Sequence, residues 1–124
     1  MKIIQNKFIP FSSYLAMTIG PFIFTKDKTK INDTVLRHET IHYYQQAELG
    51  YIIFFIFYFL SFITQLIRCS FNKEIGQIGN YRQSVWDRAY RTILFEREAY
   101  EHENDETYLD DRASWSWFLL KFYV

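Results

Sequence analysis

The chain has a single cysteine, Cys69, among its 124 residues, so it can form neither an internal disulfide nor a CxxC zinc site. Nothing in the sequence therefore requires an oxidising compartment. Internal repeats and low-complexity linkers are also missing. No signal peptide is expected, because Pro10, Ser12 and Ser13 interrupt the N-terminal apolar stretch and no clear small-residue cleavage site follows. We expect one domain over residues 1–124, too small to include a second substrate-binding lobe.

The chain has no net charge, since fourteen Lys and Arg residues balance fourteen Asp and Glu residues. The charges are unevenly distributed: residues 1–95 have eleven basic and six acidic side chains, and residues 96–124 have three and eight. This asymmetry argues against a nucleic-acid partner. Aromatic residues are abundant at 21%, with thirteen Phe and ten Tyr, which is typical of a membrane interface or of a bulky aromatic core.

The pentad His38-Glu39-Thr40-Ile41-His42 has the form HExxH. Residues four apart on a helix lie on one face, so the imidazoles of His38 and His42 can reach the same ion. Zinc lowers the pKa of its bound water toward neutrality, and Glu39 is placed to take the proton as that water attacks a carbonyl carbon. The pattern predicts a zinc hydrolase. The alternative is an amphipathic helix whose histidines are hydrogen-bonded without a metal.

The sequence before the pentad predicts a strand followed by a helix. Residues 22–25 are apolar and indicate a short strand, which could align an extended peptide by backbone pairing. Residues 26–30 are charged and indicate an exposed turn. Residues 32–34 (Asn, Asp, Thr) are good N-cap candidates for a helix that contains the pentad, and Gly50 is a natural residue at its C-terminal end.

Residues 51–67 form an uncharged apolar run of seventeen residues bounded by Arg68, and they predict a hydrophobic helix over residues 51–68. This length is borderline for a membrane span. The more polar members of the segment recur at helical spacing within about a third of the helix circumference: Tyr51, Tyr58, Ser61, Gln65 and Arg68. One face of the helix therefore suits polar neighbours, and the rest suits an apolar environment.

A catalytic zinc ion usually has three protein ligands, so the pentad predicts one more. Ser84, with Asp87 three residues later in a capping-box-like arrangement, is expected to begin a helix that runs to about Glu103. On that helix Glu96 belongs to an apolar stripe that faces the core. The other members of the stripe are Trp86, Ala89, Ile93 and Tyr100. We therefore assign Glu96 as the third zinc ligand.

Other assignments near Glu96 are less favoured. Glu98 lies roughly 200° around the helix from Glu96 and is expected among the solvated charges. His102 lies off the stripe in an acidic stretch and is expected at the surface. If no metal binds, Glu96 would instead form a salt bridge with a nearby arginine, Arg91 or Arg97.

These two motifs carry a family resemblance. HExxH followed by Glu-x-x-Ala on a second helix resembles the gluzincin metallopeptidases, here as His38-Glu39-x-x-His42 and Glu96-x-x-Ala99. The resemblance covers the two helices and the strand before them, about half of the chain, and the small size is similar to that of the minimal gluzincins. It implies that His38, His42 and Glu96 hold Zn²⁺, that Glu39 is the general base and acid, and that the substrate is a peptide or protein.

The chain departs from the gluzincin pattern at Tyr100. Many gluzincins have an Asp four residues after the ligand glutamate, where it orients a zinc-bound histidine. Here that position is Tyr100, whose hydroxyl could orient the histidine instead. The replacement of Asp by Tyr bears on catalysis more than on zinc binding. The sequence does not assign the donor that stabilises the oxyanion, for which a Tyr, His or Arg is expected.

A shared ion constrains how the apolar helix meets a membrane. His42 and Glu96 cannot bind one ion from opposite sides of a bilayer, and residues 69–95 contain no second apolar run long enough to return. The 51–68 helix is therefore expected to be internal, to dip into one leaflet, or to lie in the interface with its polar stripe toward the catalytic core. Membrane association is favoured, because a fully internal helix would require self-association through aromatic surfaces. Basic residues flank both ends, so charge gives no orientation.

Together these elements predict a mainly α (α+β) fold. It is a small helical domain with an active-site helix, a long hydrophobic helix, a Glu-bearing helix and a short N-terminal strand or hairpin, closed by a short packing helix over residues 115–120. The predicted function is a membrane-associated zinc metallopeptidase, otherwise cytoplasmic. One alternative is a catalytically weak or inactive zinc-stabilised protein that binds a membrane or a partner. Another is a metal-free membrane-interface protein with a coincidental pentad.

Overall fold

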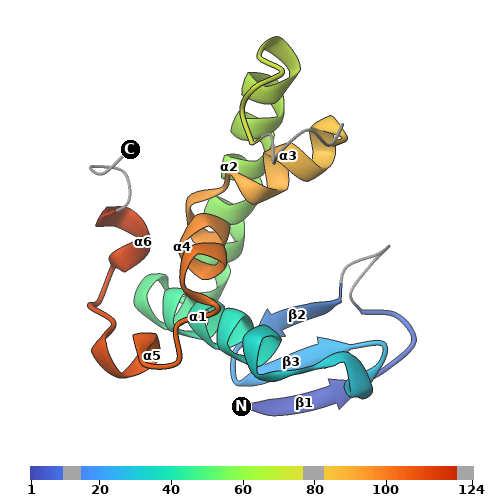
Figure 1. Ribbon diagram of the computed structural model, residues 1–124, viewed down its shortest axis with the longest axis vertical. Coiled ribbons are helices and arrows are strands. Elements are labelled where there is room, and N and C mark those ends of the chain that lie inside the picture. The colour runs from blue at the N-terminus through green and yellow to red at the C-terminus, as the bar shows by residue number, and fades with distance from the viewer. Residues whose placement is uncertain (10–14, 77–82, 120–124) are drawn as a thin grey trace.

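The computed structural model describes residues 1–9, 15–76 and 83–119 (Figure 1). The protein is mainly α-helical with a small three-stranded sheet, which confirms the predicted fold class. The sheet packs against the N-terminal part of the helical region, and the long helix α2 (Tyr51–Phe71) extends away from it (Figure 1). The expectations for Pro10, Ser12, Ser13 and residue 120 lie outside the described residues.

The sheet contains β1 (Lys2–Gln5), β2 (Ala16–Ile19) and β3 (Phe22–Thr25) in the order β1-β3-β2. β3 is the strand predicted at residues 22–25. It pairs in parallel with β1 and antiparallel with β2, so both of its edges are occupied. The expectation that this strand aligns a peptide is therefore wrong. The edge strand beside helix α1 (Asp33–Leu49) is β2.

Helix α1 (Asp33–Leu49) carries the HExxH pentad. Asn32 caps it, because its side chain accepts a hydrogen bond from the backbone N–H of Val35 at 2.9 Å. Before it, Lys28–Lys30 form a short 3-10 helix (η1). Gly50 is the single residue between α1 and the next helix, α2 (Tyr51–Phe71). Its φ is 85°, a conformation that glycine adopts without strain. The predicted boundaries of α1 are confirmed.

Helix α2 turns its more polar side toward the protein. Tyr58, Ser61 and Gln65 are half-buried on the inner side, as the polar stripe predicted, whereas Tyr51 and Arg68 are exposed. The outer side is apolar, with exposed residues that include Ile52, Ile53, Ile56, Phe59, Leu60, Ile63 and Ile67. Within the described part of the chain, α2 is the one helix long and apolar enough to cross a membrane.

The helix predicted from Ser84 to Glu103 is wrong as a single element. It is divided into α3 (Val85–Arg91) and α4 (Leu94–His102). The N–H groups of Thr92 and Ile93 donate three residues back, to the carbonyls of Ala89 and Tyr90, and Ile93 has an extended backbone, so the α-helical hydrogen-bond ladder stops there. Trp86 consequently lies 60% exposed on α3, stacked on Phe62, rather than on a stripe shared with Glu96.

Glu98 is the second correction on this segment, because it is fully buried rather than solvated. Arg112, which follows α5 (Tyr108–Asp111), bridges Glu98 and Glu48 of α1 with Nε–Oε2 and Nη1–Oε2 distances of 2.6 and 2.9 Å. The carboxylate tolerates burial because Arg112 neutralises it and Tyr108 also donates to it.

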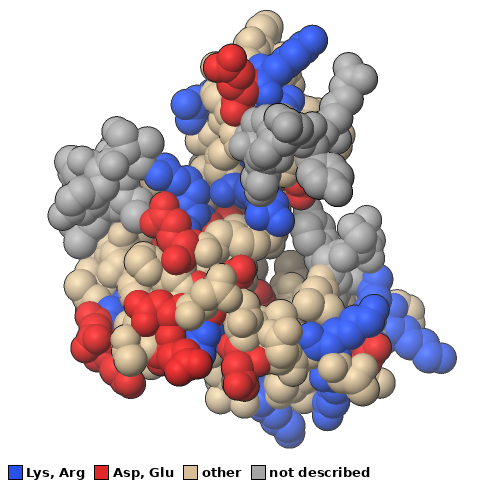
Figure 2. Space-filling model, viewed as in Figure 1, with Lys and Arg blue, Asp and Glu red and all other residues tan. Residues whose placement is uncertain are grey.

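Two features of the C-terminal region agree with the sequence. The predicted packing helix is α6 (Ser116–Leu119), whose Trp117 packs on Phe95 beside the buried core residues Phe54 and Ile93. Acidic side chains gather at the lower left of Figure 2, around α5, and basic ones gather over the sheet.

Candidate metal centre

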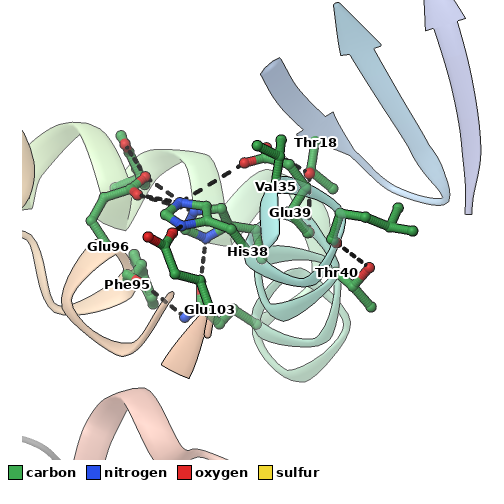
Figure 3. A network of polar contacts seen from close by, with 12 residues as sticks. Thr18, Val35, His38, Glu39, Thr40, Phe95, Glu96 and Glu103 are labelled. Atoms are coloured by element: carbon green, nitrogen blue, oxygen red, sulfur yellow. Dashed lines mark hydrogen bonds and ion pairs between the residues drawn. The ribbon is translucent and has the colours of Figure 1, made fainter. Parts of the chain in front are cut away.

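The structure brings His38, His42 and Glu96 together between α1 and α4 (Figure 3). The Nε2 atom of each histidine lies 3.1 Å from Oε1 of Glu96. All three side chains are buried, with exposed fractions of 6%, 6% and 2%. Neither Arg91 nor Arg97 pairs with Glu96; Arg91 approaches Asp87 at 3.8 Å instead. The contacts of Glu96 are thus those expected of a third ligand.

The neighbours of the two imidazoles determine where their protons lie. Nδ1 of His38 faces a carboxylate oxygen of Glu103 at 2.6 Å, and Nδ1 of His42 faces the amide oxygen of Gln45 at 2.8 Å. The orientation of the Gln45 amide is fixed, because its nitrogen donates to the Phe95 carbonyl and to Glu98. Both Nδ1 atoms therefore carry hydrogen, and in neutral imidazoles both Nε2 lone pairs point at the Glu96 carboxylate.

Converging lone pairs repel one another unless a cation lies between them. Bonds of about 2.0 to 2.2 Å to a tetrahedral ion place neighbouring ligand atoms roughly 3.3 to 3.6 Å apart. Here the closest such separation is 3.1 Å, and all the donor atoms lie within 4.8 Å of one another. Two imidazoles and one carboxylate are also a donor set that suits a catalytic zinc ion. In spacing, burial and chemistry, the cluster fits a divalent metal.

In the metal-free protein a proton takes the place of the cation. Burial acts to lower the pKa of His42, but the adjacent Glu96 carboxylate outweighs it and raises that pKa to about 10. Burial acts to raise the pKa of Glu96, but the two imidazoles hold that pKa well below its usual value. Glu96 is therefore a carboxylate in the buried site, as a metal ligand must be.

Glu39 lies beside the cluster and points toward the strand β2. Thr18 donates its hydroxyl to Oε1 of Glu39 at 2.9 Å, and Oε2 lies 3.9 Å from Nε2 of His38 (Figure 3). Burial raises the pKa of Glu39, although the two nearby imidazoles oppose this effect. A buried carboxyl with a raised pKa, held beside a metal site, is suited to accept and return a proton.

Sequence reasoning missed the groups that orient the two histidines. The carboxylate on His38 comes from Glu103, seven residues after Glu96, and not from the position of Tyr100. Tyr100 instead packs its ring against His38 with ring centroids 4.6 Å apart. Helical spacing gave a signal for both missed groups: Gln45 lies three residues after His42, and Glu103 lies two turns after Glu96. His102 takes no part in the cluster and stacks on Tyr108.

Two tyrosines at the site were also missed. Tyr58 of α2 donates its hydroxyl to Oε2 of Glu96 at 2.8 Å. Tyr90 of α3 lines the same cavity as Glu39, His42 and Glu96, and burial raises its pKa well above the usual value. A protonated phenol beside a metal cluster is a hydrogen-bond donor of the kind that stabilises an oxyanion. Tyr58 lay on the predicted polar stripe of α2, which was its only signal in the sequence.

Comparisons of the chain with protein-family models, with curated proteins and with solved structures gave no match. What the site can do is therefore argued from its own atoms. Two imidazoles and a carboxylate converge, a buried carboxyl lies beside them, and a cavity is lined by His42, Glu96 and Glu39.

The contact between Glu103 and His38 predicts a metal-affinity phenotype. Replacing Glu103 by alanine removes the group that holds the Nδ1 proton, so we expect zinc to bind about 10- to 100-fold more weakly. Competition titration against a chromophoric chelator measures this. Glu101→Ala, an exposed carboxylate on the same helix, is the matched control and should leave the affinity unchanged. Equal affinities in the two variants would show that Glu103 does not orient the site.

Proposed function

We propose that this protein is a gluzincin-like zinc metallopeptidase that works at a membrane surface. The observation that carries the proposal is the convergence of His38, His42 and Glu96 with Glu39 beside them. Zinc bound there would lower the pKa of a water molecule and polarise a substrate carbonyl. Oε2 of Glu39 is placed to accept the proton of the attacking water and then to return it to the leaving amine.

The direct test is hydrolysis of a panel of quenched fluorescent peptides by the purified protein, with its metal content measured in parallel. The proposal expects about one zinc per chain and cleavage that stops with a chelator and returns with added zinc. A protein that contains and binds no divalent metal would overturn the proposal.

The proton on His42 predicts how metal binding depends on pH. With a pKa of about 10 in the metal-free site, His42 is protonated at neutral pH and must lose its proton to bind zinc. Zinc affinity should therefore rise about tenfold per pH unit from neutrality toward pH 10, with about one proton released per ion. Calorimetry in buffers of different ionisation enthalpy counts these protons. A result of no proton released would contradict the assignment of His42.

The same pKa predicts how the stability of the metal-free protein changes with pH. A histidine whose folded pKa is raised above its ordinary value of 6.5 stabilises the fold fully below pH 6.5, and this contribution is lost as the pH rises through about 10.

Helix α2 supports the membrane part of the proposal. Its outer face is more apolar than its inner face, and Ile52, Ile56 and Ile67 are 78%, 53% and 56% exposed. Helices α3 and α4 pack along the inner face through contacts such as Phe62 with Trp86 and Tyr58 with Glu96. A helix that crossed a bilayer alone would draw the charged α3 and α4 into it. We therefore place α2 flat in the interface, with its outer face in the acyl region.

Flotation with vesicles of phosphatidylcholine and phosphatidylglycerol tests this placement. Ile52→Gln and Ile56→Gln together should lower vesicle binding, since each isoleucine contributes up to roughly 1.5 to 3 kcal/mol when it enters an apolar phase. Phe8→Gln, an equally exposed apolar residue away from α2, is the control and should bind as wild type does. Unchanged binding by the double variant would contradict the placement of α2.

A further inference from the structure

A cavity of about 590 Å³ adjoins the metal-ligand cluster, and its size is typical of a site that takes a ligand. Glu39, His42 and Glu96 lie on one side of it. The rest of its lining is mostly apolar and comes chiefly from the inner edge of α2 and from the strand β2, with Gln46 of α1 and Tyr90 of α3. Any molecule that reaches the cluster through this cavity therefore contacts an aromatic helix on one side and a strand edge on the other.

The aromatic wall continues onto the outer surface of α2. Phe55, Phe59 and Phe62 follow one side of the helix at intervals of four and three residues, and all three line the cavity. Phe59 is also 62% exposed, so it belongs both to the cavity and to the outer apolar face, next to Ile52 and Ile63. The rim of the cavity thus merges with the surface that the proposed function places in lipid.

The opposite wall presents backbone groups. The amide of Gln46 bonds β2 like a neighbouring strand residue: its nitrogen donates to the Thr18 carbonyl, and its oxygen accepts from the Gly20 N–H, both at 2.7 Å. In an antiparallel pair the carbonyl of residue i and the N–H of residue i+2 point to the same side. The next such pair on this edge is the Ala16 carbonyl and the Thr18 N–H, and Ala16 and Thr18 both line the cavity.

We propose that the cavity binds an extended peptide segment that arrives from the lipid side of α2. The backbone of the segment pairs with Ala16 and Thr18. Its bulky apolar side chain packs on Phe55, Phe59 and Phe62. The inference rests on the proposed function and names its substrate class: apolar stretches of polypeptide held at a membrane. Gln46 closes one end of the β2 edge, so a single substrate residue pairs next to the cluster.

Binding to a protein that does not cleave tests the cavity separately from catalysis. Zinc-loaded Glu39→Gln protein in detergent micelles is titrated with fluorescent peptides that differ at one central position, which is Phe, Ser or Lys. The Phe peptide should bind at least about tenfold more tightly than the other two. Phe59→Ala should remove this preference, whereas Ile52→Ala, an exposed α2 residue outside the cavity, should keep it. Equal affinities for all three peptides would overturn the inference.

Backbone pairing is tested with the same protein by moving an N-methyl group along the Phe peptide. Loss of one N–H donor should weaken binding at the residue that faces the Ala16 carbonyl and have little effect at its neighbours, whose N–H groups point away. A uniform response along the peptide would overturn the pairing with β2.

Wild-type cleavage on vesicles completes the test. An acylated Phe peptide in phosphatidylcholine and phosphatidylglycerol vesicles should be cut faster than its unacylated form at equal bulk concentration, and equal rates would overturn arrival from the lipid side. If no peptide is cut but the Phe peptide still binds selectively, the hydrolase proposal fails and the cavity assignment stands. If cleavage occurs without preference for apolar peptides, the hydrolase stands and this inference fails.

Discussion

Replacing Glu39 by glutamine should slow peptide hydrolysis by about 10²- to 10⁴-fold while zinc binding persists. The change removes one ionisable group and keeps the size of the side chain. Thr18 can still donate its hydroxyl to the amide oxygen, so the position of the side chain should be preserved. The loss would therefore report the missing proton acceptor and not a displaced residue.

The stability of this variant can be predicted from the environment of Glu39. Burial raises the pKa of Glu39, which means that ionising this side chain costs more free energy in the fold than in the unfolded chain. A neutral glutamine removes that cost, so the variant should be at least as stable as wild type. Glu101→Gln makes the same chemical change on an exposed residue and is the matched control for activity. Cleavage by Glu39→Gln at the wild-type rate would remove Glu39 from the mechanism.

The second large effect concerns the metal ligands themselves. His42→Ala and Glu96→Gln each remove a ligand, and both should remove most of the stabilisation that zinc gives to the wild-type protein. At a zinc concentration 100 times the dissociation constant, binding stabilises a fold by about 2.7 kcal/mol. If a variant binds about 100-fold more weakly, the gain at the same concentration falls to about 0.4 kcal/mol.

Thermal melting with and without zinc measures this difference, and the chain contains its own control. It has three histidines, and His102 stacks on Tyr108 away from the cluster, so His102→Ala should keep the full zinc effect. Glu96→Gln keeps an acceptor for the Tyr58 hydroxyl, which favours a folded variant. A melt of wild-type protein that does not respond to zinc or to chelation would contradict both the enzyme and a zinc-stabilised binding protein.

The two functions separate at the next step. A zinc-stabilised protein that only binds lipid or a partner through the outer face of α2 would show the same loss of stability on chelation. It would cut no peptide, and Glu39→Gln would have no phenotype. Peptide hydrolysis therefore distinguishes these functions, whereas thermal stability alone does not.

The parts of the fold that local sequence determines were predictable. The cap of α1 at Asn32 and its end at Gly50 follow from side-chain and backbone preferences, and the inward polar stripe of α2 follows from helical periodicity. The approach of Glu96 to the two histidines was expected from the need for a third ligand. The start of the Glu96-bearing helix at Leu94 was not expected, because no proline or glycine marks the break before it in the sequence.

Two other errors came from long-range contacts. Glu98 has the sequence pattern of a solvated residue, and it is buried because Arg112 reaches it from fourteen residues away. Strand β1 pairs in parallel with β3 across some twenty residues, a contact that periodicity does not reveal. The strand at residues 22–25 was identified correctly, but its central place in the sheet required knowledge of both neighbours.

Anomalous X-ray scattering at the zinc absorption edge, from crystals of the protein equilibrated with zinc, tests the central claim most directly. The account predicts one strong peak bounded by Nε2 of His38, Nε2 of His42 and the carboxylate of Glu96, with bonds of about 2.0 to 2.2 Å. A zinc-equilibrated crystal with no peak among these three side chains, or with its peak at other residues, would contradict it.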